Sequence, residues 1–353
     1  MSSSAQPLSR RVGFILFPGF SLIAFASAIE PLRVANMLSP HPLYRFVLAS
    51  PRKGMVQASN AIPMTAEYDL RDIPACDMVV LCAGYGGEYI EDEDLSAWLR
   101  KLARQGVMLV GMGTGTYLLA RSKLLNGRRC TVHWENIASV AEEFPGLDVS
   151  DKVYVQDGHF VTCCGGTGSM DMMLEIIGQQ NGCKLARGIA DQLVCPPTRK
   201  PSDRQLANAD RFGTLNPELA TVLDLMEANL EQTLSLNALA ARAGISVRQI
   251  QRLFQALLRV SPGQYYLELR LNRARALLIQ STLSIAKIAA GCGFSSTSHL
   301  SAYYKRFHGI SPLNERKALQ SSGDKGVYVA SALQRKDLLS RTAPDRIPEK
   351  RSA

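Results

Sequence analysis

Residues 107–120, VMLVGMGTGTYLLA, have the pattern of an apolar strand that breaks at glycines and continues as a helix. A strand-to-helix turn of this kind often presents a nucleophilic Cys or Ser, which a nearby histidine activates. Here the histidine is present as His133, but Gly113 occupies the turn itself. Glycine has no side-chain atom that can form a covalent intermediate. The sequence therefore predicts no nucleophilic catalysis at this turn.

Three other residues are alternative nucleophiles, and each would need a particular geometry. Thr114 is next to the turn, Cys82 ends a neighbouring apolar segment, and Cys130 is close to His133 in sequence. The eight cysteines mostly lie inside apolar segments and none has the spacing of zinc ligands. We expect them to be small buried residues, and we expect neither a metal site nor a cofactor.

The same turn could hold a ligand instead. In open parallel sheets, ligands bind beyond the carboxyl ends of the strands, where glycine loops and helix N-termini expose backbone N–H groups. An indole beside carboxylates suits a cationic head group, and the loop amides suit a carboxylate. Each candidate also has a structural alternative to ligand binding: Glu30 would be a surface carboxylate, His133 a structural histidine and Trp134 a core residue. The candidate ligand-binding residues are Glu30, Gly84, Gly113, Thr114, His133, Trp134 and Glu135.

A second group of polar residues follows one face of a predicted helix near residue 250. Ser246 and Gln249 have the spacing of a capping box at its start. The predicted buried face consists of Ile250, Leu253, Phe254, Leu257 and Leu258. The opposite face carries Arg248, Gln251, Arg252 and Gln255. Arginine pairs with guanine and glutamine with adenine in the major groove, so this row has the chemistry of DNA reading. A row of this kind by itself is more typical of a solvated helix face, but the capping box, together with the positive charge and the internal repeat of the helical region, favours DNA reading.

The elements that must position these residues fall into two kinds. Up to about residue 195, short apolar strands alternate with helical segments, a pattern typical of an α/β domain with a mostly parallel sheet. Residues 196–217 are polar, carry four prolines and are predicted to be a linker. Residues 218–320 show helical patterns only, and residues 321–353 form a polar tail that we expect to be disordered.

The positive charge lies in the helical part. Residues 1–217 have 21 basic and 21 acidic side chains, whereas residues 218–320 have 12 and 6 and the tail has 7 and 4. The helical region thus has the charge expected of a part that meets a polyanion. The chain has no apolar run long enough for a membrane span and no apolar leader before its first strand, so we expect a cytoplasmic protein without membrane contact.

The helical region is also an internal repeat. Leu234–Leu236 recur as Leu283–Ile285, and Gly244 and Ser246 recur as Gly293 and Ser295, all with an offset of 49. From Ile250 onward the offset is 50. Each copy is a helix, a glycine turn and a second helix, which is the helix-turn-helix pattern. In the second copy the predicted buried residues are Leu300, Tyr303, Tyr304 and Phe307, and the outward residues are Ser298, His299, Ser301, Ala302 and Lys305.

The segments ISVRQIQRLFQ, SPGQYYLELRLNRARALLIQ and SIAKIAAGCGFSSTSHLSAYYKRFHGISP are very similar to the DNA-binding domain of AraC/XylS-type bacterial transcriptional regulators. The resemblance implies two helix-turn-helix units joined by a long helix at about 262–280, with recognition helices in successive major-groove faces. It implies promoter DNA and RNA polymerase as partners. The candidate DNA-binding residues are Arg248, Gln249, Gln251, Arg252 and Gln255 in the first unit and Thr297, Ser298, His299, Ser301 and Lys305 in the second.

The N-terminal part resembles the class I glutamine amidotransferase-like superfamily through FPGFSLIAFASAIEPLRVAN, LCAGYGG, GMGTGTYLLA, TVHWEN and GGTGSMDMMLEII. In enzymes of that superfamily a cysteine occupies the position of Gly113. Joined to the helical region, this part resembles the amidotransferase-like subgroup of AraC-type regulators. The resemblance implies a flavodoxin-like α/β sensing domain at residues 10–195, a homodimer, and effectors such as arginine-like amino acids or quaternary amines.

Together these features predict a transcriptional regulator that is not an enzyme and is controlled by a small metabolite, and the family resemblance implies an activator. The DNA-binding domain is expected at residues 218–320. An enzyme or a redox-stress protein with a DNA-binding appendage remains the alternative.

Overall fold

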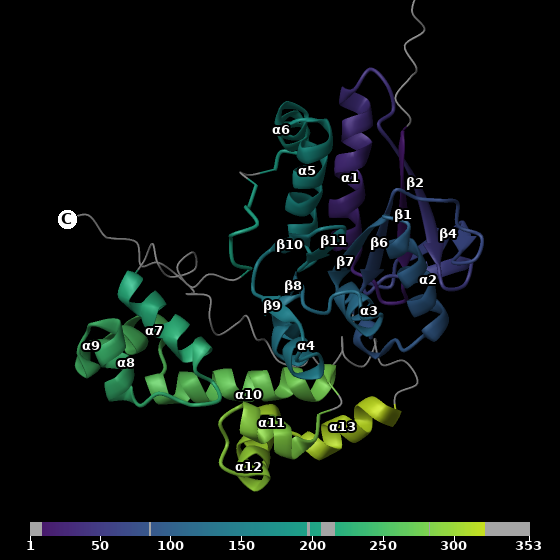
Figure 1. Cartoon of the computed structure of the whole chain (residues 1–353). Coiled ribbons are helices and arrows are strands. Elements are labelled where there is room, and N and C mark those ends of the chain that lie inside the picture. The colour runs from purple at the N-terminus through teal and green to yellow at the C-terminus, as the bar shows by residue number, and fades with distance from the viewer. Residues whose placement is uncertain (1–8, 85, 196–197, 206–215, 282, 322–353) are drawn as a thin grey trace, which may run out of the picture. The chain divides into compact units, whose positions relative to one another are not determined.

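The computed structural model describes residues 9–84, 86–195, 198–205, 216–281 and 283–321, which separate into two compact units (Figure 1). The first unit contains the described residues up to Gln205, and the second contains those from 216 onward. Parts of the expected tail and linker lie outside the described residues, namely the tail from residue 322 onward and residues 196–197 and 206–215 of the linker. In the described part of the chain, no helix is long and apolar enough to cross a membrane.

A seven-stranded sheet forms the centre of the first unit. Its strands pair in the order β10-β11-β7-β6-β1-β2-β5, and all pairs are parallel except the β10–β11 hairpin. This arrangement confirms the expected flavodoxin-like α/β architecture. The strands are β1 (Arg10–Leu16), β2 (Tyr44–Ser50), β5 (Tyr68–Asp69), β6 (Met78–Ala83), β7 (Met108–Gly113), β10 (Tyr154–Asp157) and β11 (Phe160–Cys163).

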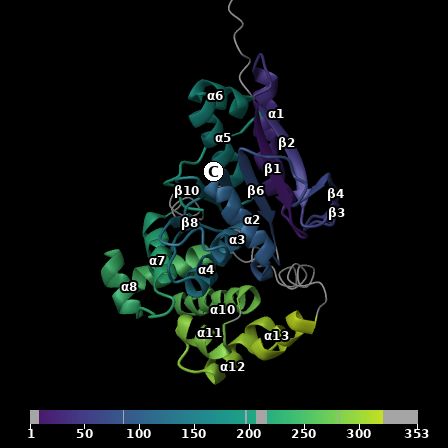
Figure 2. The ribbon, with the colours of Figure 1, turned by 45° about the vertical axis from the view of Figure 1, so that its right-hand side comes forward.

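Helices cover both faces of the sheet (Figure 2). The layer on one face consists of α1 (Leu22–Leu38), α5 (Gly168–Asn181) and α6 (Cys183–Gln192); the layer on the other consists of α2 (Glu93–Arg104), α3 (Gly115–Arg121) and α4 (Ile137–Glu143). Phe14 and Leu16 belong to the core of the first layer, and Ile15 belongs to that of the second. Because alternate side chains of a strand enter opposite cores, central strands are apolar at nearly every position.

Several short elements complete this unit. The hairpin of β3 (Gly54–Gln57) and β4 (Pro63–Ala66) and the parallel pair of β8 (Arg129–Thr131) and β9 (Asp148–Ser150) lie outside the main sheet. Two three-residue 3-10 turns, η1 (Gly87–Tyr89) and η2 (Trp134–Asn136), follow β6 and β8. The α-helix after β8 thus begins only at Ile137, directly after η2.

Residues 198–205, which the sequence assigns to the linker, are bonded to the first unit. The Arg199 guanidinium donates to Asp171 and to the hydroxyl of Thr167. Gln205 Nε2 donates to Thr131 Oγ1 at 3.0 Å and to the Val132 carbonyl oxygen at 2.7 Å. The α/β unit therefore extends beyond the boundary expected at residue 195.

The second unit is entirely helical in its described residues. Its long helix α10 has the bounds expected for the connection between the two repeats. The buried Arg275 pairs with Glu315 at 2.8 Å, and Glu315 accepts a 2.6 Å hydrogen bond from Tyr304. The helices are α7 (Pro217–Ala228), α8 (Leu236–Ala243), α9 (Val247–Leu253), α10 (Pro262–Gln280), α11 (Ile285–Gly291), α12 (Thr297–His308) and α13 (Pro312–Ser321).

The two repeats share their turn geometry. Ser235 and Ser284 cap α8 and α11 with their hydroxyls, and Gly244 and Gly293 adopt left-handed φ values of 70° and 69°. The cap of α9 is Ser246, but that of α12 is Ser296 rather than Ser295, the residue that the offset of 49 predicts. The extra residue of the second copy thus lies between Gly293 and the helix cap.

Two residues of the predicted buried faces are exposed. Leu257 keeps 39% of its surface because α9 continues into a π-helical turn, Phe254–Leu258, which shifts the helical register, whereas Leu258 is buried as predicted. Tyr303 keeps 37% of its surface and packs on the ring of His299, at a centroid distance of 4.9 Å. It lies at the edge of the helix face that Leu300 and Tyr304 bury.

Candidate functional site

The turn between β7 and α3 is built from residues with minimal side chains. Gly113 has a φ of +56°, and a Cβ at this position would lie 3.3 Å from the Ala83 carbonyl oxygen. Gly165, in the loop after β11, lies against Gly113: a Cβ there would be 3.5 Å from the Gly113 Cα and 3.9 Å from the Ala24 Cβ on α1. Three segments therefore meet at the turn, and the residues in contact there, Gly113, Gly165 and Ala24, carry no nucleophilic side chain.

Thr114 serves a structural role. It is buried, and its hydroxyl donates a 2.5 Å hydrogen bond to the Gly84 carbonyl oxygen. Gly84 approaches the Gly19 backbone so closely that a Cβ would collide with it, and Gly87 approaches the Thr114 side chain in the same way. Thr114 thus joins the loop after β6 to the turn, and its hydroxyl is already engaged.

Neither alternative thiol is suited to nucleophilic attack. Cys82 and Cys130 are buried. Burial raises the pKa of Cys82 far above its ordinary value and that of Cys130 to about 12. At neutral pH both therefore remain thiols, whereas the thiolate is the reactive form.

The segment that follows β8 brings His133, Trp134 and Glu135 together. His133 Nδ1 lies 3.5 Å from Glu135 Oε2. Burial lowers the pKa of His133 to about 4 and raises that of Glu135, so the imidazole is neutral at neutral pH. Trp134 keeps 45% of its surface, with its ring 5.6 Å from that of His133. Trp134 is therefore an accessible indole and not a core residue.

Glu30 lies away from the turn. Its carboxylate accepts a 2.8 Å hydrogen bond from Arg33 on the same helix. The α1 residue beside Gly165 is Ala24, and six residues of helix place Glu30 about 9 Å further along the axis. The structure thus supports the alternative that Glu30 is a surface carboxylate.

Three buried polar residues near the turn have no counterpart among the residues selected from the sequence. They are Glu88 in η1, Tyr117 in α3 and Asn136 in η2. Glu88 Oε2 accepts a 3.0 Å hydrogen bond from the Gly86 N–H, and burial raises the pKa of this carboxyl to about 7. In the sequence, the only signal for Glu88 is an acidic residue directly after the glycines of LCAGYGG.

A cavity of about 830 Å³ lies elsewhere in the α/β unit. It is lined by residues of α2, including Trp98, and by residues 69–71 and 73–76. None of the predicted ligand-binding residues lines it. In the described part of the chain, no group of three or more His, Cys, Asp or Glu side chains could hold a metal ion.

The polar row on α9 faces solvent. Arg248, Gln251, Arg252 and Gln255 are exposed and form no hydrogen bond or ion pair with the described residues. Gln249 differs, because its Nε2 donates a 2.5 Å hydrogen bond to Glu218 Oε2 on α7. Ser246 accepts from the Gln249 backbone N–H, so only that half of the capping box forms. The Gln249 side chain is therefore bonded to another helix of the protein, unlike the four side chains of the exposed row.

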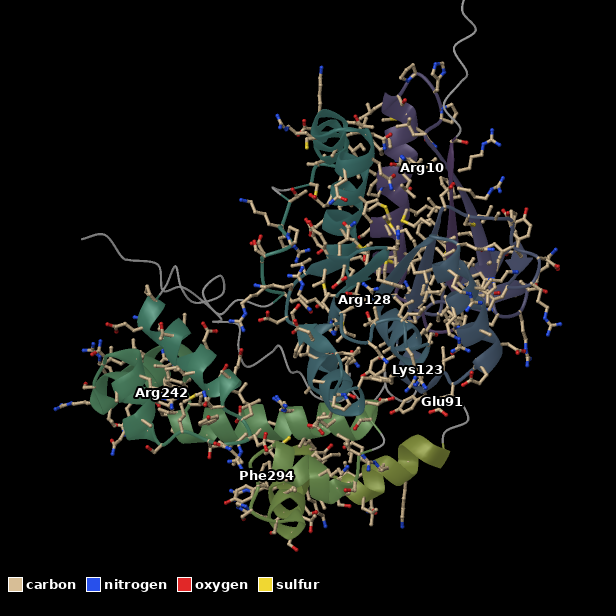
Figure 3. The ribbon with its side chains drawn as sticks, in the orientation of Figure 1. Arg10, Glu91, Lys123, Arg128, Arg242 and Phe294 are labelled. Carbon is tan, nitrogen blue, oxygen red and sulfur yellow. The ribbon has the colours of Figure 1, made fainter. Side chains whose placement is uncertain are left out.

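In the second copy, Thr297, Ser298, His299 and Lys305 are exposed and Ser301 is half-buried. The His299 ring packs against Phe294 and Tyr303, at centroid distances of 5.7 and 4.9 Å. The Arg270 guanidinium of α10 lies over the ring of Phe294, which Figure 3 labels, at 4.2 Å from the ring centroid. The start of α12 is thus held against the connecting helix through aromatic contacts.

Comparisons with known proteins match both units. A model described as the DJ-1/PfpI family matches residues 10–179, and one described as a helix-turn-helix domain matches residues 239–318. The HTH-type transcriptional regulator GbdR of Pseudomonas aeruginosa is 41% identical over 307 residues, which cover 87% of this chain and 84% of that protein. CdhR of the same species is 39% identical, covering 88% and 93%, and GlxA of Rhizobium meliloti is 38% identical, covering 90% and 98%.

An α/β unit of the DJ-1/PfpI kind joined to a duplicated helix-turn-helix unit defines a transcriptional regulator, not an enzyme. The chain belongs to the AraC-type regulators with an amidotransferase-like N-terminal domain, the group of GbdR, CdhR and GlxA.

Proposed function

We propose that this regulator activates transcription by reading promoter DNA through α9 and α12 and that a small metabolite bound in the α/β unit controls it. The observation that carries the DNA-reading part is the exposed row of Arg248, Gln251, Arg252 and Gln255, whose side chains are free to meet base edges. On α12, Thr297, Ser298, His299, Ser301 and Lys305 contribute phosphate contacts and weaker base contacts.

The effector in this proposal is an amino acid or a quaternary amine. The open indole of Trp134 offers cation–π attraction, and Glu135 lies next to it. The neutral His133 adds no positive charge that would repel a cationic group. Gly84, Gly113 and Thr114 supply the backbone of the site, while Glu30, paired with Arg33, has no part in it.

The remaining assignments follow from this proposal. Residues 10–195 sense the effector and form a homodimer, and residues 218–320 bind DNA. Residues 196–217 join them, and within this segment residues 198–205 are bonded to the α/β unit. RNA polymerase is the partner at the promoter, and the protein acts in the cytoplasm, where that DNA lies.

Calorimetry and footprinting test the proposal. L-arginine, glycine betaine and L-carnitine would be titrated into the full chain and into its Trp134→Ala and Trp134→Phe variants. We expect one of these metabolites to bind, with Trp134→Phe retaining more affinity than Trp134→Ala because phenylalanine keeps a π face. Absence of heat and of a thermal shift with every metabolite would reject the effector class. Footprints without preference among promoter fragments would reject the DNA-reading assignment.

A further inference from the structure

Three buried polar atoms around the first turns of α3 have no hydrogen-bond partner in the described part of the chain. They are Glu88 Oε1, the Tyr117 hydroxyl and Asn136 Nδ2. Glu88 keeps 2% of its surface, Asn136 keeps 3% and Tyr117 is fully buried. Buried polar groups are paired in most native structures because an unpaired one is costly. Three such atoms in one region therefore indicate a place where another molecule supplies the missing partners.

The three residues lie near one another, because Asn136 and the charge of Glu88 both act on the Tyr117 hydroxyl. Burial raises the pKa of the Tyr117 hydroxyl, and the nearby Ser139 and Asn136 side chains lower that pKa in part, although neither contact has the geometry of a hydrogen bond. The charge of Glu88 acts on the same hydroxyl and raises its pKa, in addition to the larger effect of burial.

The nearest cation does not neutralise Glu88 by direct contact. Arg121 lowers the pKa of Glu88 through its charge, but its Nη2 pairs with Glu143 at 2.7 Å and its Nη1 donates to the Ile90 carbonyl oxygen. One oxygen of the Glu88 carboxylate is thus available to a donor from outside the protein.

The site adjoins the position proposed for the effector. Gly87, directly before Glu88, packs on the Thr114 side chain, and Asn136 directly follows Glu135. Glu88 offers an acceptor, Asn136 a donor and Tyr117 either, so together they complement a donor-bearing cation beside an acceptor. A quaternary ammonium has no N–H and cannot satisfy Glu88 Oε1.

We propose that Glu88, Tyr117 and Asn136 form the polar end of the effector site and bind a small metabolite that carries an N–H-bearing amine or guanidinium close to a carboxylate. This inference rests on the proposed function and narrows its effector to the amino-acid class. The exposed Trp134 lies in the same 3-10 turn as Asn136, so the proposed polar end adjoins the accessible indole.

The test uses the full chain with glycine, L-arginine and glycine betaine, which is glycine with its ammonium hydrogens replaced by methyl groups. The variants are Glu88→Gln, Tyr117→Phe and, as a matched control, Glu91→Gln, which alters an exposed carboxylate three residues away that Figure 3 labels. We expect glycine or L-arginine to bind the wild type and Glu91→Gln equally, and Glu88→Gln at least tenfold more weakly. Tyr117→Phe, which removes only the hydroxyl, should also weaken binding and serves if Glu88→Gln does not fold.

Other outcomes overturn the inference. If glycine betaine binds alone and Glu88→Gln binds it as the wild type does, the proposed function stands and this assignment fails. Equal affinity of wild type and Glu88→Gln for L-arginine has the same meaning. If no probe binds the wild type, the amino-acid class is rejected together with the wider effector proposal, whereas DNA selectivity is measured independently.

Discussion

The α/β unit and the helical unit both use left-handed glycines at a turn, but they direct their polar side chains differently. In the α/β unit, the loop after β6 and the first turn of α3 keep Glu88 and Tyr117 inside, without full hydrogen bonding. In the helical unit, the turn at Gly244 leads into α9, whose Arg248 and Arg252 point to solvent. Substitutions in the first region should therefore change stability, pH response and effector binding, while those on α9 should change DNA affinity.

The largest effect is expected from Gly293→Ala in the helical unit. A Cβ there would lie 2.6 Å from the Leu230 carbonyl oxygen and 2.7 Å from that of Glu231, and the φ of +69° adds strain. We expect a loss of about 3 kcal/mol in the free energy of unfolding, measured with urea. The matched control is Gly244→Ala, which has a φ of +70° and open space, and should cost about 1 kcal/mol. Equal losses would contradict the close packing of the second turn.

In the α/β unit, Glu88→Gln should change how stability depends on pH. The folded state keeps the Glu88 proton up to about pH 7, whereas the unfolded chain releases it near 4.5, so stability falls as pH rises between these values. This difference corresponds to about 3 kcal/mol. Arg121, Glu143 and Tyr117 act on Glu88 in the wild type, and Glu88→Gln should flatten the curve.

Urea unfolding at pH 5, 6, 7 and 8 measures this effect. His133 acts in the opposite sense, because burial lowers its pKa and the free energy of unfolding therefore decreases as pH falls below about 6.5. This contribution is the same in the wild type and in Glu88→Gln, so the comparison of the two curves removes it. Parallel curves for wild type and Glu88→Gln would show that Glu88 ionises normally.

On the exposed side of the comparison, Arg252→Ala should cost about 1 to 3 kcal/mol of DNA-binding free energy at its cognate base pair and relax selectivity there. Its stability should be unchanged, because the side chain has no partner in the described residues. Arg242→Ala on α8, labelled in Figure 3, is the control and should alter all sequences alike. Competition assays with single-base-pair variants measure both. If Arg252→Ala lost the same affinity for every DNA sequence, the base contact would belong to another residue.

The smallest effect is expected at the turn itself. Gly113→Ala should cost about 1 kcal/mol because its φ of +56° is unfavourable for a side chain and the Ala83 carbonyl oxygen is close. DNA selectivity should not change. Gly146→Ala, in open space, is the control for thermal unfolding and should be neutral. A stabilised Gly113→Ala variant would show that the turn does not need the left-handed conformation.

Local signals predict much of this fold. The two helical units follow from the internal repeat, in which Ser235 and Ser284, the caps of α8 and α11, occupy equivalent positions. The connecting helix Pro262–Gln280 is expected from the resemblance to AraC/XylS-type DNA-binding domains. The α/β alternation follows from apolar strands, and the loss of the nucleophile follows from a single residue, Gly113.

Features that depend on contacts between distant segments are not predictable in the same way. Glu30 and Glu88 are both glutamates after an apolar segment, but only the fold shows that one pairs on the surface and the other is buried. The exposure of Leu257 depends on a π-helical turn, and the engagement of Gln249 depends on Glu218 of another helix. Periodicity alone contains none of this information.

The most direct test of the central claim is selection of duplex DNA of random sequence by the full chain, with and without L-arginine, followed by sequencing. The account predicts enrichment of a motif read on two major-groove faces about one helical turn apart, with a yield that L-arginine changes in the wild type but not in Glu88→Gln. Recovery of unenriched DNA, or an identical yield with and without the amino acid, would contradict it.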